Sequence, residues 1–181
     1  MLAGLPFYRN LVQYIAGKKR NIHINYTLQT NGILLDDDWC KFLAKYGFLI
    51  GISLDILPES HDAVRVDTAG QGTYEQVLRS ISLLKKYHIA HNVLCTLTRQ
   101  TARHPAKVWA QIKKLDLSYI QFTPCLGDLN SPGSSAYALT PERFFTFILI
   151  FLISGTGISP REITGASSYL TIFFSCLQRG S

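Results

Sequence analysis

The stretch Phe48–Arg65, FLIGISLDILPESHDAVR, determines how the rest of the chain is interpreted. It opens with an apolar run, Phe48–Ile52, of the length expected for a strand buried on both faces. The sequence then turns polar at Ser53 and Asp55, and the carboxyl end of a strand is where α/β sheets bind ligands. Arg65 follows twelve residues after Ser53. A hydroxyl at a strand end with a guanidinium reaching back over it predicts a site for a ligand that carries a carboxylate and a ribose. A buried strand followed by an ordinary polar loop is the alternative.

Length and composition indicate one domain with a real hydrophobic core. The chain has 181 residues, of which 47% are apolar, and this is too short for two such domains. The net charge of +6 comes from 18 basic and 12 acidic residues. The basic residues are scattered apart from Lys18–Arg20 and Lys85–Lys86, and neither run has the interleaved aromatic side chains of a nucleic-acid groove. We therefore expect no nucleic-acid partner.

The four cysteines, Cys40, Cys95, Cys125 and Cys176, stand far apart and match neither a zinc nor an iron–sulfur spacing. We expect them to be buried thiols. No signal peptide is recognisable, which favours a reducing cytoplasm without structural disulfides. The longest apolar run, Phe144–Ile153, falls well short of the ~20 residues needed to span a bilayer, so no membrane association is expected.

Hydrophobic periodicity predicts an alternation of helices and strands. Helices are expected at 5–16, 36–46, 73–88 and 105–115, and strands at 22–28, 48–54, 92–97 and 119–123. Asp36 is placed to cap the second helix. Thr73, with Gln76 three residues later, predicts a capping box at the start of the third.

This alternation predicts the fold class and the place of the site. Strands joined through helices form βα units, and right-handed crossovers put the carboxyl ends of all the strands on one edge of a parallel sheet. These ends carry, in chain order, Gln29–Asn31, Ser53 with Asp55, Thr98–Gln100 and Pro124–Leu126. The fold is therefore expected to be α/β, with polar groups that converge at one edge of the sheet.

The remaining titratable residues give no distinct site. Surface or capping roles are expected for all five histidines, which have no ligand spacing: His23, His61, His88, His91 and His104. Three acidic residues, Asp55, Asp62 and Asp67, suit general acid–base chemistry, but helix caps and turns explain them as well.

The character of the chain changes after Thr146. Only three of the charged residues, Arg161, Glu162 and Arg179, come after it. Phe144–Ile153 is apolar on all sides, which is typical of a helix that is buried or lies in an interface. We expect a core domain over residues 1–146 and a divergent tail over 147–181.

Five segments resemble one protein family when they are taken together and in order. They are Asn25–Gly32, Gly51–Asp55, His61–Asp62, Arg65–Asp67 and Ile120–Cys125. Their sequences and spacing resemble the radical S-adenosylmethionine (radical SAM) enzymes and, within them, the anaerobic sulfatase-maturating enzymes. The resemblance covers the chain from about Leu2 to Arg143.

The resemblance implies a fold, a cofactor and a reaction. The family core is a partial (β/α)6 barrel, in which a [4Fe-4S] cluster reduces S-adenosylmethionine (AdoMet) to a 5′-deoxyadenosyl radical. In the sulfatase-maturating members, this radical starts the oxidation of a cysteine or serine of a sulfatase to formylglycine. At the matching positions, Ser53 and Arg65 are expected to contact the ribose and the carboxylate of AdoMet. Gln29 is expected to line the same pocket, and the backbone of Leu126 to contact the adenine.

The chain also departs from the family pattern. It has no CxxxCxxC motif for the cluster, no Gly-Gly-Glu-Pro segment for the amino group of AdoMet and no cysteine-rich C-terminal domain. Ile56 replaces the usual glycine, and the loss of charge after Thr146 is typical of a shifted reading frame. We therefore expect a remnant that does not bind the cluster on its own. Two alternatives remain: an enzyme completed by a separate polypeptide, and a non-catalytic interaction fragment that uses an open sheet edge and Phe144–Ile153.

Overall fold

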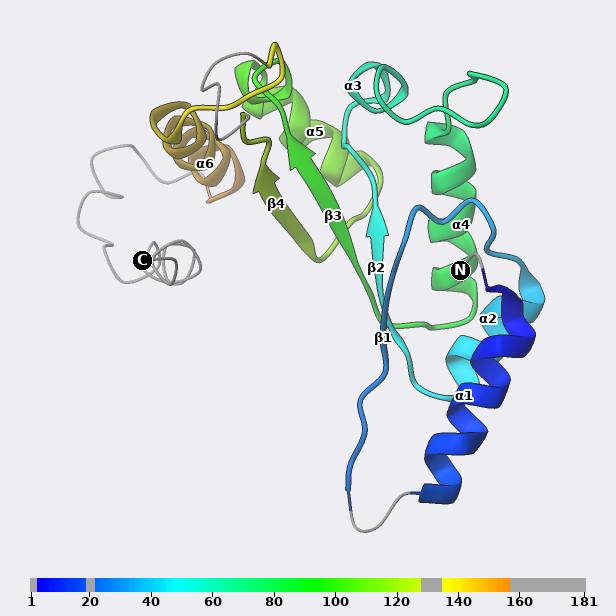
Figure 1. The fold of residues 1–181 in the computed structure, drawn as a ribbon. Helices are drawn as coiled ribbons and strands as arrows, with labels where there is room; N and C mark the ends of the chain where they lie inside the picture. Colours follow the sequence, from blue (N-terminus) through cyan, green and yellow to red (C-terminus); the bar gives the residue numbers. More distant parts are fainter. Residues whose placement is uncertain (1–2, 19–21, 128–134, 157–181) are drawn as a thin grey trace.

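A computed structural model describes residues 3–18, 22–127 and 135–156 of the chain. Its four strands form one parallel sheet in the order β1-β2-β3-β4, with α1, α2 and α4 to the right of the strands in Figure 1 and α6 to the left, beyond β4. The elements are α1 (Gly4–Lys18), β1 (Thr27–Thr30), α2 (Asp37–Lys45), β2 (Leu49–Ser53), α3 (Pro58–Asp62), α4 (Tyr74–Lys86), β3 (His91–Leu97), η1 (Thr101–Arg103), α5 (Pro105–Lys114), β4 (Ile120–Pro124) and α6 (Pro141–Thr156). The α/β class and the parallel strands are confirmed.

The first strand is shorter at its start, and longer at its end, than the sequence indicates. The alternating pattern begins at Ile22, but the ladder with β2 begins only where Thr27 pairs with Leu49, and it continues to Thr30. The pattern therefore identified an extended segment, whereas pairing with β2 sets the bounds of the strand.

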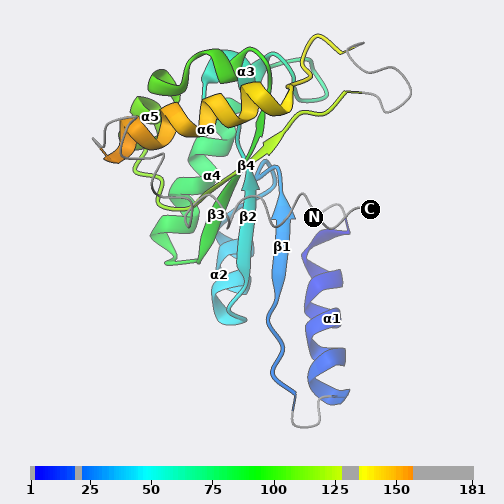
Figure 2. The ribbon, with the colours of Figure 1, turned by 90° about the vertical axis from the view of Figure 1, so that its left-hand side faces the viewer.

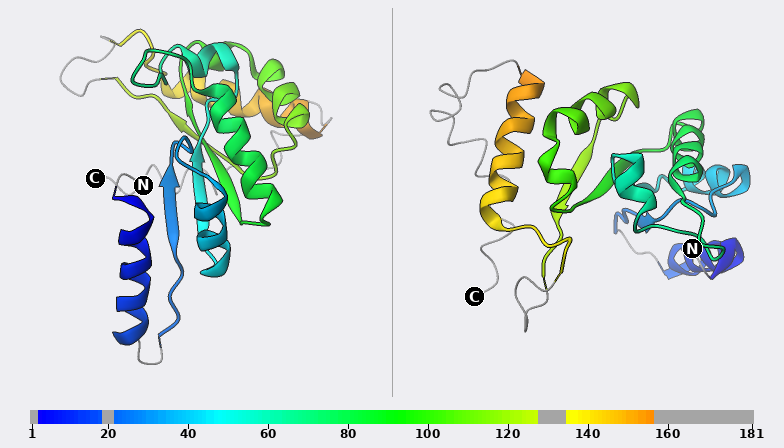
Figure 3. Two further views of the ribbon diagram at one scale, coloured as in Figure 1. Left: turned by 90° about the vertical axis from the view of Figure 1, so that its right-hand side faces the viewer. Right: turned by 90° about the horizontal axis from the view of Figure 1, so that it is seen from above.

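The sheet has one covered face and one open face. Successive side chains point to opposite faces of the sheet. On one face Ile50, Ile52, Val93, Cys95, Leu97 and Phe122 are buried, whereas on the other Gln29, Gln121 and Thr123 are exposed. The view from above in Figure 3 shows α4, α5 and the orange α6 as an arc around one side of the strands. We call the helix-covered side the covered face and the other side the open face.

Helix starts follow the sequence in one case and differ in another. Asp36 caps α2 as expected, because its carboxylate accepts the backbone N–H of Trp39 at 2.8 Å. The capping box predicted at Thr73 is wrong, since the Thr73 side chain makes no capping hydrogen bond. The Asp62 carboxylate instead accepts the backbone N–H of Tyr74 at 2.9 Å. The start of α4 is thus tied to the end of α3.

Helix α6 continues the core past residue 146. Phe147 is 1% exposed and packs its ring edge against Phe122, with ring centroids 5.2 Å apart. Other apolar side chains of α6 face outward, since Phe145 is 43% and Ile150 39% exposed. Within the described ranges, no helix is long and apolar enough to cross a bilayer. The greater part of the predicted tail, residues 157–181, lies outside the described residues.

Candidate functional site

The carboxyl ends of the strands meet at one edge, as the parallel order requires. Figure 2 shows the arrows of β1 and β2 side by side and pointing the same way. Their registers align Thr30 with Ile52 and Ser53 with Leu94, so that β1 and β2 end within one residue of each other, whereas β3 continues three residues further, to Leu97. This edge carries the polar segments that the sequence places at the strand ends.

A cavity of about 230 Å³ lies at this edge. It is lined by residues from the ends of β1 and β2, from α3, from the loop between α3 and α4, and from α4: Asn31, Ile33, Ser53, His61, Val64, Arg65, Val66, Thr73 and Val77. Ser53 and Arg65, predicted to face the same ligand, therefore lie in one cavity. Asn31 was not predicted to contact the ligand, although it closes the polar segment Gln29–Asn31 at the end of β1.

The other two predicted residues lie elsewhere. Gln29 is on the open face, where its Cγ is 3.2 Å from the position that a Cβ at Gly51 would take. Glycine at this position therefore leaves room for Gln29 beside β2. Leu126 follows β4 and is 70% exposed. Neither is among the residues that line the cavity with Ser53 and Arg65.

Arg65 is held by an ion pair with Asp55. The Arg65 Nε donates to Asp55 Oδ2 at 2.8 Å, and its Nη2 lies 3.5 Å from Oδ1. The backbone N–H of Thr96 donates to the same Oδ1 at 2.9 Å. The Asp55 side chain is only 3% exposed, whereas that of Arg65 is 29% exposed. A buried carboxylate is tolerated because both of its oxygens are engaged.

His61 is a buried residue of the site, and the surface or capping role predicted for it is wrong. It is 0% exposed, and its Nδ1 accepts the backbone N–H of Asp55 at 3.1 Å. Its Nε2 lies 3.1 Å from the Thr73 hydroxyl, and the ring edge of Tyr74 packs on it. Burial lowers the pKa of His61 below its usual value, although the nearby Asp55 carboxylate partly opposes this shift. No helical or strand periodicity signals such a residue, and the signals that pointed to it were its place after β2 and its membership of the segments that carry the family resemblance.

The described residues do not fit an iron–sulfur cluster. Thiolates are needed to hold one, but burial raises the pKa of the Cys40 thiol to about 11 and that of Cys95 to about 12. Cys125 is half-buried after β4, and Cys176 lies outside the described residues. Within the described ranges, no three His, Cys, Asp or Glu side chains come together as metal ligands.

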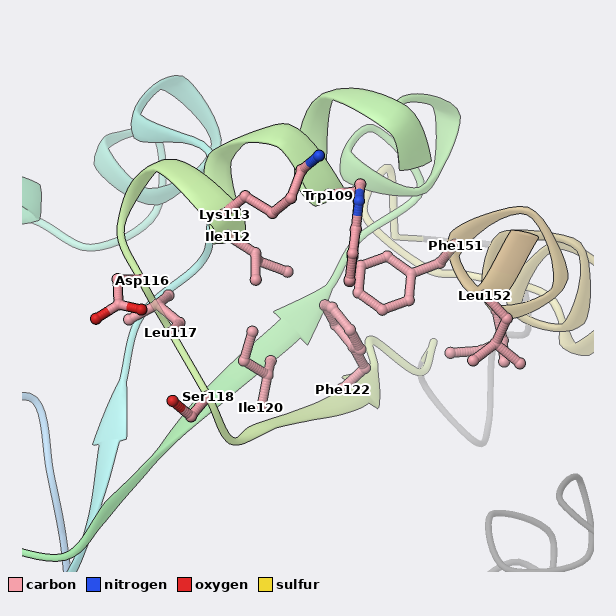
Figure 4. Close-up of a pocket in the computed structure, with 11 residues that line it drawn as sticks. Trp109, Ile112, Lys113, Asp116, Leu117, Ser118, Ile120, Phe122, Phe151 and Leu152 are labelled. Carbon is pink, nitrogen blue, oxygen red and sulfur yellow. The ribbon is translucent and has the colours of Figure 1, made fainter. Parts of the chain in front are cut away.

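A second hollow differs from the polar cavity in chemistry and place. It measures about 570 Å³ and lies between α5, β4 and α6, where Trp109, Phe122 and Phe151 meet (Figure 4). The rings of Trp109 and Phe151 pack edge to face with centroids 5.1 Å apart. Lys113 and Asp116 are the charged residues of its lining. Its mainly apolar lining is a feature of the helix packing rather than a second polar site.

Comparison with known proteins identifies the family. The model of the radical SAM superfamily matches residues 1–108. The chain is 37% identical over 149 residues to the cysteine-type anaerobic sulfatase-maturating enzyme of Clostridium novyi (strain NT), covering 81% of this chain and 40% of the relative. It is 33% identical over 150 residues to the serine-type enzyme of Klebsiella aerogenes, covering 82% of this chain and 37% of that protein. The chain thus spans about 40% of the length of the curated relatives it matches.

Solved structures lead to the same family. The structure described as native anSMEcpe with bound AdoMet and Kp18Cys peptide matches with a TM-score of 0.79 and 38% identity, covering 83% of this chain and 42% of that chain. The structure described as native anSMEcpe with bound AdoMet has the same TM-score and identity. The fold, the polar edge of the sheet and these matches together place the chain in the radical SAM superfamily.

Proposed function

We propose that this chain supplies the central part of the AdoMet-binding site of a sulfatase-maturating radical SAM enzyme. The observation that carries the proposal is the cavity that Ser53 and Arg65 share at the carboxyl ends of parallel strands. In this proposal Arg65 binds the carboxylate of AdoMet and Ser53 the ribose. Gln29, on the open face beside β2, and the backbone of Leu126 extend the site toward the rest of the ligand.

The residues that face the cavity suit such a ligand. Arg65 is paired with Asp55 through Nε and Nη2, and no partner for its Nη1 occurs within the part of the chain that the structure describes. A guanidinium held from one side presents its remaining N–H donors to an anion in a fixed plane. The Ser53 hydroxyl and the Asn31 amide add neutral hydrogen-bonding groups, which suit a ribose.

The chemistry of the cofactor belongs to the iron–sulfur cluster. In the family, a cluster bound beside AdoMet supplies the electron that releases a 5′-deoxyadenosyl radical. The described residues do not fit such a cluster, as shown above, so we propose that the 181-residue chain binds AdoMet without cleaving it. We further propose that the complete enzyme acts on a cysteine or serine of a sulfatase, in keeping with the names of the relatives and the peptide named in the matched structure.

Calorimetric titration of the purified chain with AdoMet tests the binding proposal. We expect binding by the unaltered chain and at least a tenfold weaker affinity for Arg65→Gln, because a charged partner of the carboxylate is lost. Arg9→Gln removes the same charge from α1 and is the matched control. Equal affinities of Arg65→Gln and Arg9→Gln would contradict the assignment of the cavity.

Anaerobic reconstitution with iron and sulfide tests the second part of the proposal. We expect no cluster absorbance and no bound iron above that of a chain in which all four cysteines are replaced by serine. A brown product with about four irons per chain would show that the cysteines do assemble a cluster.

A second candidate is an active enzyme completed by another polypeptide. The observation in its favour is that β1 is an edge strand within the described sheet, so that a further parallel strand has hydrogen-bonding groups to pair with. Co-expression with a neighbouring gene product that carries CxxxCxxC should then give reductive cleavage of AdoMet. Co-purification without any cleavage would remove this candidate.

A further inference from the structure

The Asp55 carboxylate is held by the backbone of β3 independently of its ion pair with Arg65. Asp55 follows β2 by two residues, and its Oδ1 accepts the backbone N–H of Thr96 from the neighbouring strand β3 at 2.9 Å. Its Oδ2 is left for the Nε of Arg65 at 2.8 Å. A carboxylate anchored to the sheet in this way defines both the position and the plane of the guanidinium, because the Arg–carboxylate contact is directional.

A second chain of hydrogen bonds fixes the backbone of Arg65. Because the Nδ1 of His61 accepts the Asp55 N–H, the ring proton of the neutral histidine lies on Nε2, which donates to the Thr73 hydroxyl at 3.1 Å. The Thr73 hydroxyl in turn donates to the Arg65 carbonyl at 3.0 Å. This series of hydrogen bonds requires a neutral His61, because a protonated Nδ1 could not accept the Asp55 N–H. The end of β2 is thus connected to the Arg65 backbone through one buried ring.

We propose that Asp55 and His61 are positioning residues, which hold Arg65 so that its free donors meet a ligand carboxylate in the cavity. Asp55 sets the plane of the guanidinium, and His61 sets the distance of the Arg65 backbone from β2. Asp55 is not among the residues that line the cavity, and His61, which does line it, acts on the ligand through Thr73 and Arg65. The proposal rests on the proposed function for the identity of the ligand, but the orientation of Arg65 is testable without any ligand.

The first experiment compares two ligands on two variants. AdoMet and decarboxylated AdoMet differ only in the carboxylate, and their affinities are measured by calorimetry for the unaltered chain, Asp55→Asn and Asp67→Asn. Asp67 lies in the loop of Arg65, between α3 and α4, and its carboxylate accepts the backbone N–H groups of Ala69 and Gln71, which the asparagine side-chain oxygen also does. We expect AdoMet to bind roughly tenfold more tightly than its analogue to the unaltered chain and to Asp67→Asn. The two ligands should bind about equally to Asp55→Asn.

The ratio of the two affinities separates positioning from general damage. A variant that merely loosens the fold weakens the binding of both ligands by the same factor and leaves the ratio of their affinities unchanged. An unchanged ratio in Asp55→Asn would therefore overturn the proposal. If Asp55→Asn does not fold, Asp55→Glu is the second variant, because it keeps the buried charge and moves the carboxylate by one methylene. It is also expected to bind AdoMet and decarboxylated AdoMet with about equal affinity.

The second experiment needs no ligand. In the NMR spectrum of arginine side chains, the Nε–H signal of Arg65, identified by its absence in Arg65→Gln, is expected to exchange slowly with water. In Asp55→Asn it should shift and exchange fast, and in Asp67→Asn it should stay as it is. If the unaltered chain binds neither ligand, the proposed function fails, and this signal alone decides the positioning role. A slowly exchanging Nε–H in Asp55→Asn would contradict that role.

Discussion

The covered face and the open face of the sheet are built by the same strands but differ in chemistry. Ile50 and Ile52 of β2 are 0% exposed beneath the helices, whereas Leu49 on the open face is 45% exposed and Ser53 borders the cavity. Parallel sheets are normally covered on both faces. Here burial largely alternates along β3 and β4, although Gly51 of β2 is buried as well, so one face supplies most of the core and the other keeps polar groups within reach of a ligand. Stability and binding should therefore respond separately to substitutions on the two faces.

The largest effect is expected from the covered face. Ile52→Ala removes a fully buried side chain and should lower the free energy of unfolding by about 2–4 kcal/mol. Leu49→Ala, in the same strand but on the open face, should cost less than about 1 kcal/mol. Urea unfolding followed by circular dichroism measures both. Equal costs would mean that the open face is also packed.

A smaller loss of stability is expected where the loop meets α4. A Cβ at Gly72 would lie 2.3 Å from the Cγ of Asp62, whose carboxylate caps α4. Gly72→Ala should therefore displace this cap and cost about 1–3 kcal/mol. Gly17→Ala in α1 meets nothing within 4 Å and is the control. A melting temperature of Gly72→Ala that matches the control would show that the loop shifts without cost.

A substitution of Ser53 should change the affinity for AdoMet but not the stability of the fold. Ser53→Ala removes a neutral hydrogen bond and should weaken AdoMet binding roughly threefold, without a change in unfolding. Ser82→Ala removes a hydroxyl that donates to the Leu78 carbonyl on the exposed side of α4, and its affinity should equal that of the unaltered chain. Calorimetry distinguishes the two. A Ser53→Ala variant with unaltered affinity would place the ribose elsewhere.

The smallest effect is a dependence of stability on pH. Burial lowers the pKa of His61 below its usual value of 6.5, so its contribution is fully present above pH 6.5 and is lost as the pH falls toward the lowered value. The charged groups Asp55, Asp62 and Arg65 surround the ring. Urea midpoints should fall between pH 7 and pH 5 in the unaltered chain and in His23→Gln, and fall less in His61→Gln. A slope that is the same in all three would show that other groups control it.

Periodicity and chain order predicted more of the fold than of the site. The βα alternation gave the parallel sheet, and the polar residues after β2 led to a cavity shared by Ser53 and Arg65. The details of the site that the sequence did not predict depend on how the loops after β2 and α3 fold. The burial of His61 and the cap that Asp62 gives to α4 depend on a loop folding back on the end of β2, which neither a 3.6-residue nor a 2-residue period records.

The site also shows why residue type alone was misleading. Thr73 matches a capping pattern but donates to the Arg65 carbonyl instead. Asp55 could be a cap or a general acid–base residue by sequence, but it forms an ion pair with Arg65. In both cases a contact with a residue eight or more positions away replaced a local one, and such contacts follow from the tertiary fold rather than from the neighbouring residues.

The most direct measurement is a titration of the isotope-labelled chain with AdoMet, followed by backbone amide NMR. If the account is right, the shifted resonances gather around Asn31, Ser53 and Arg65 at the carboxyl edge of the strands, while those around Trp109 and Phe151 stay unchanged. Shifts centred on the apolar hollow between α5 and α6, or no shifts at saturating AdoMet, would contradict it.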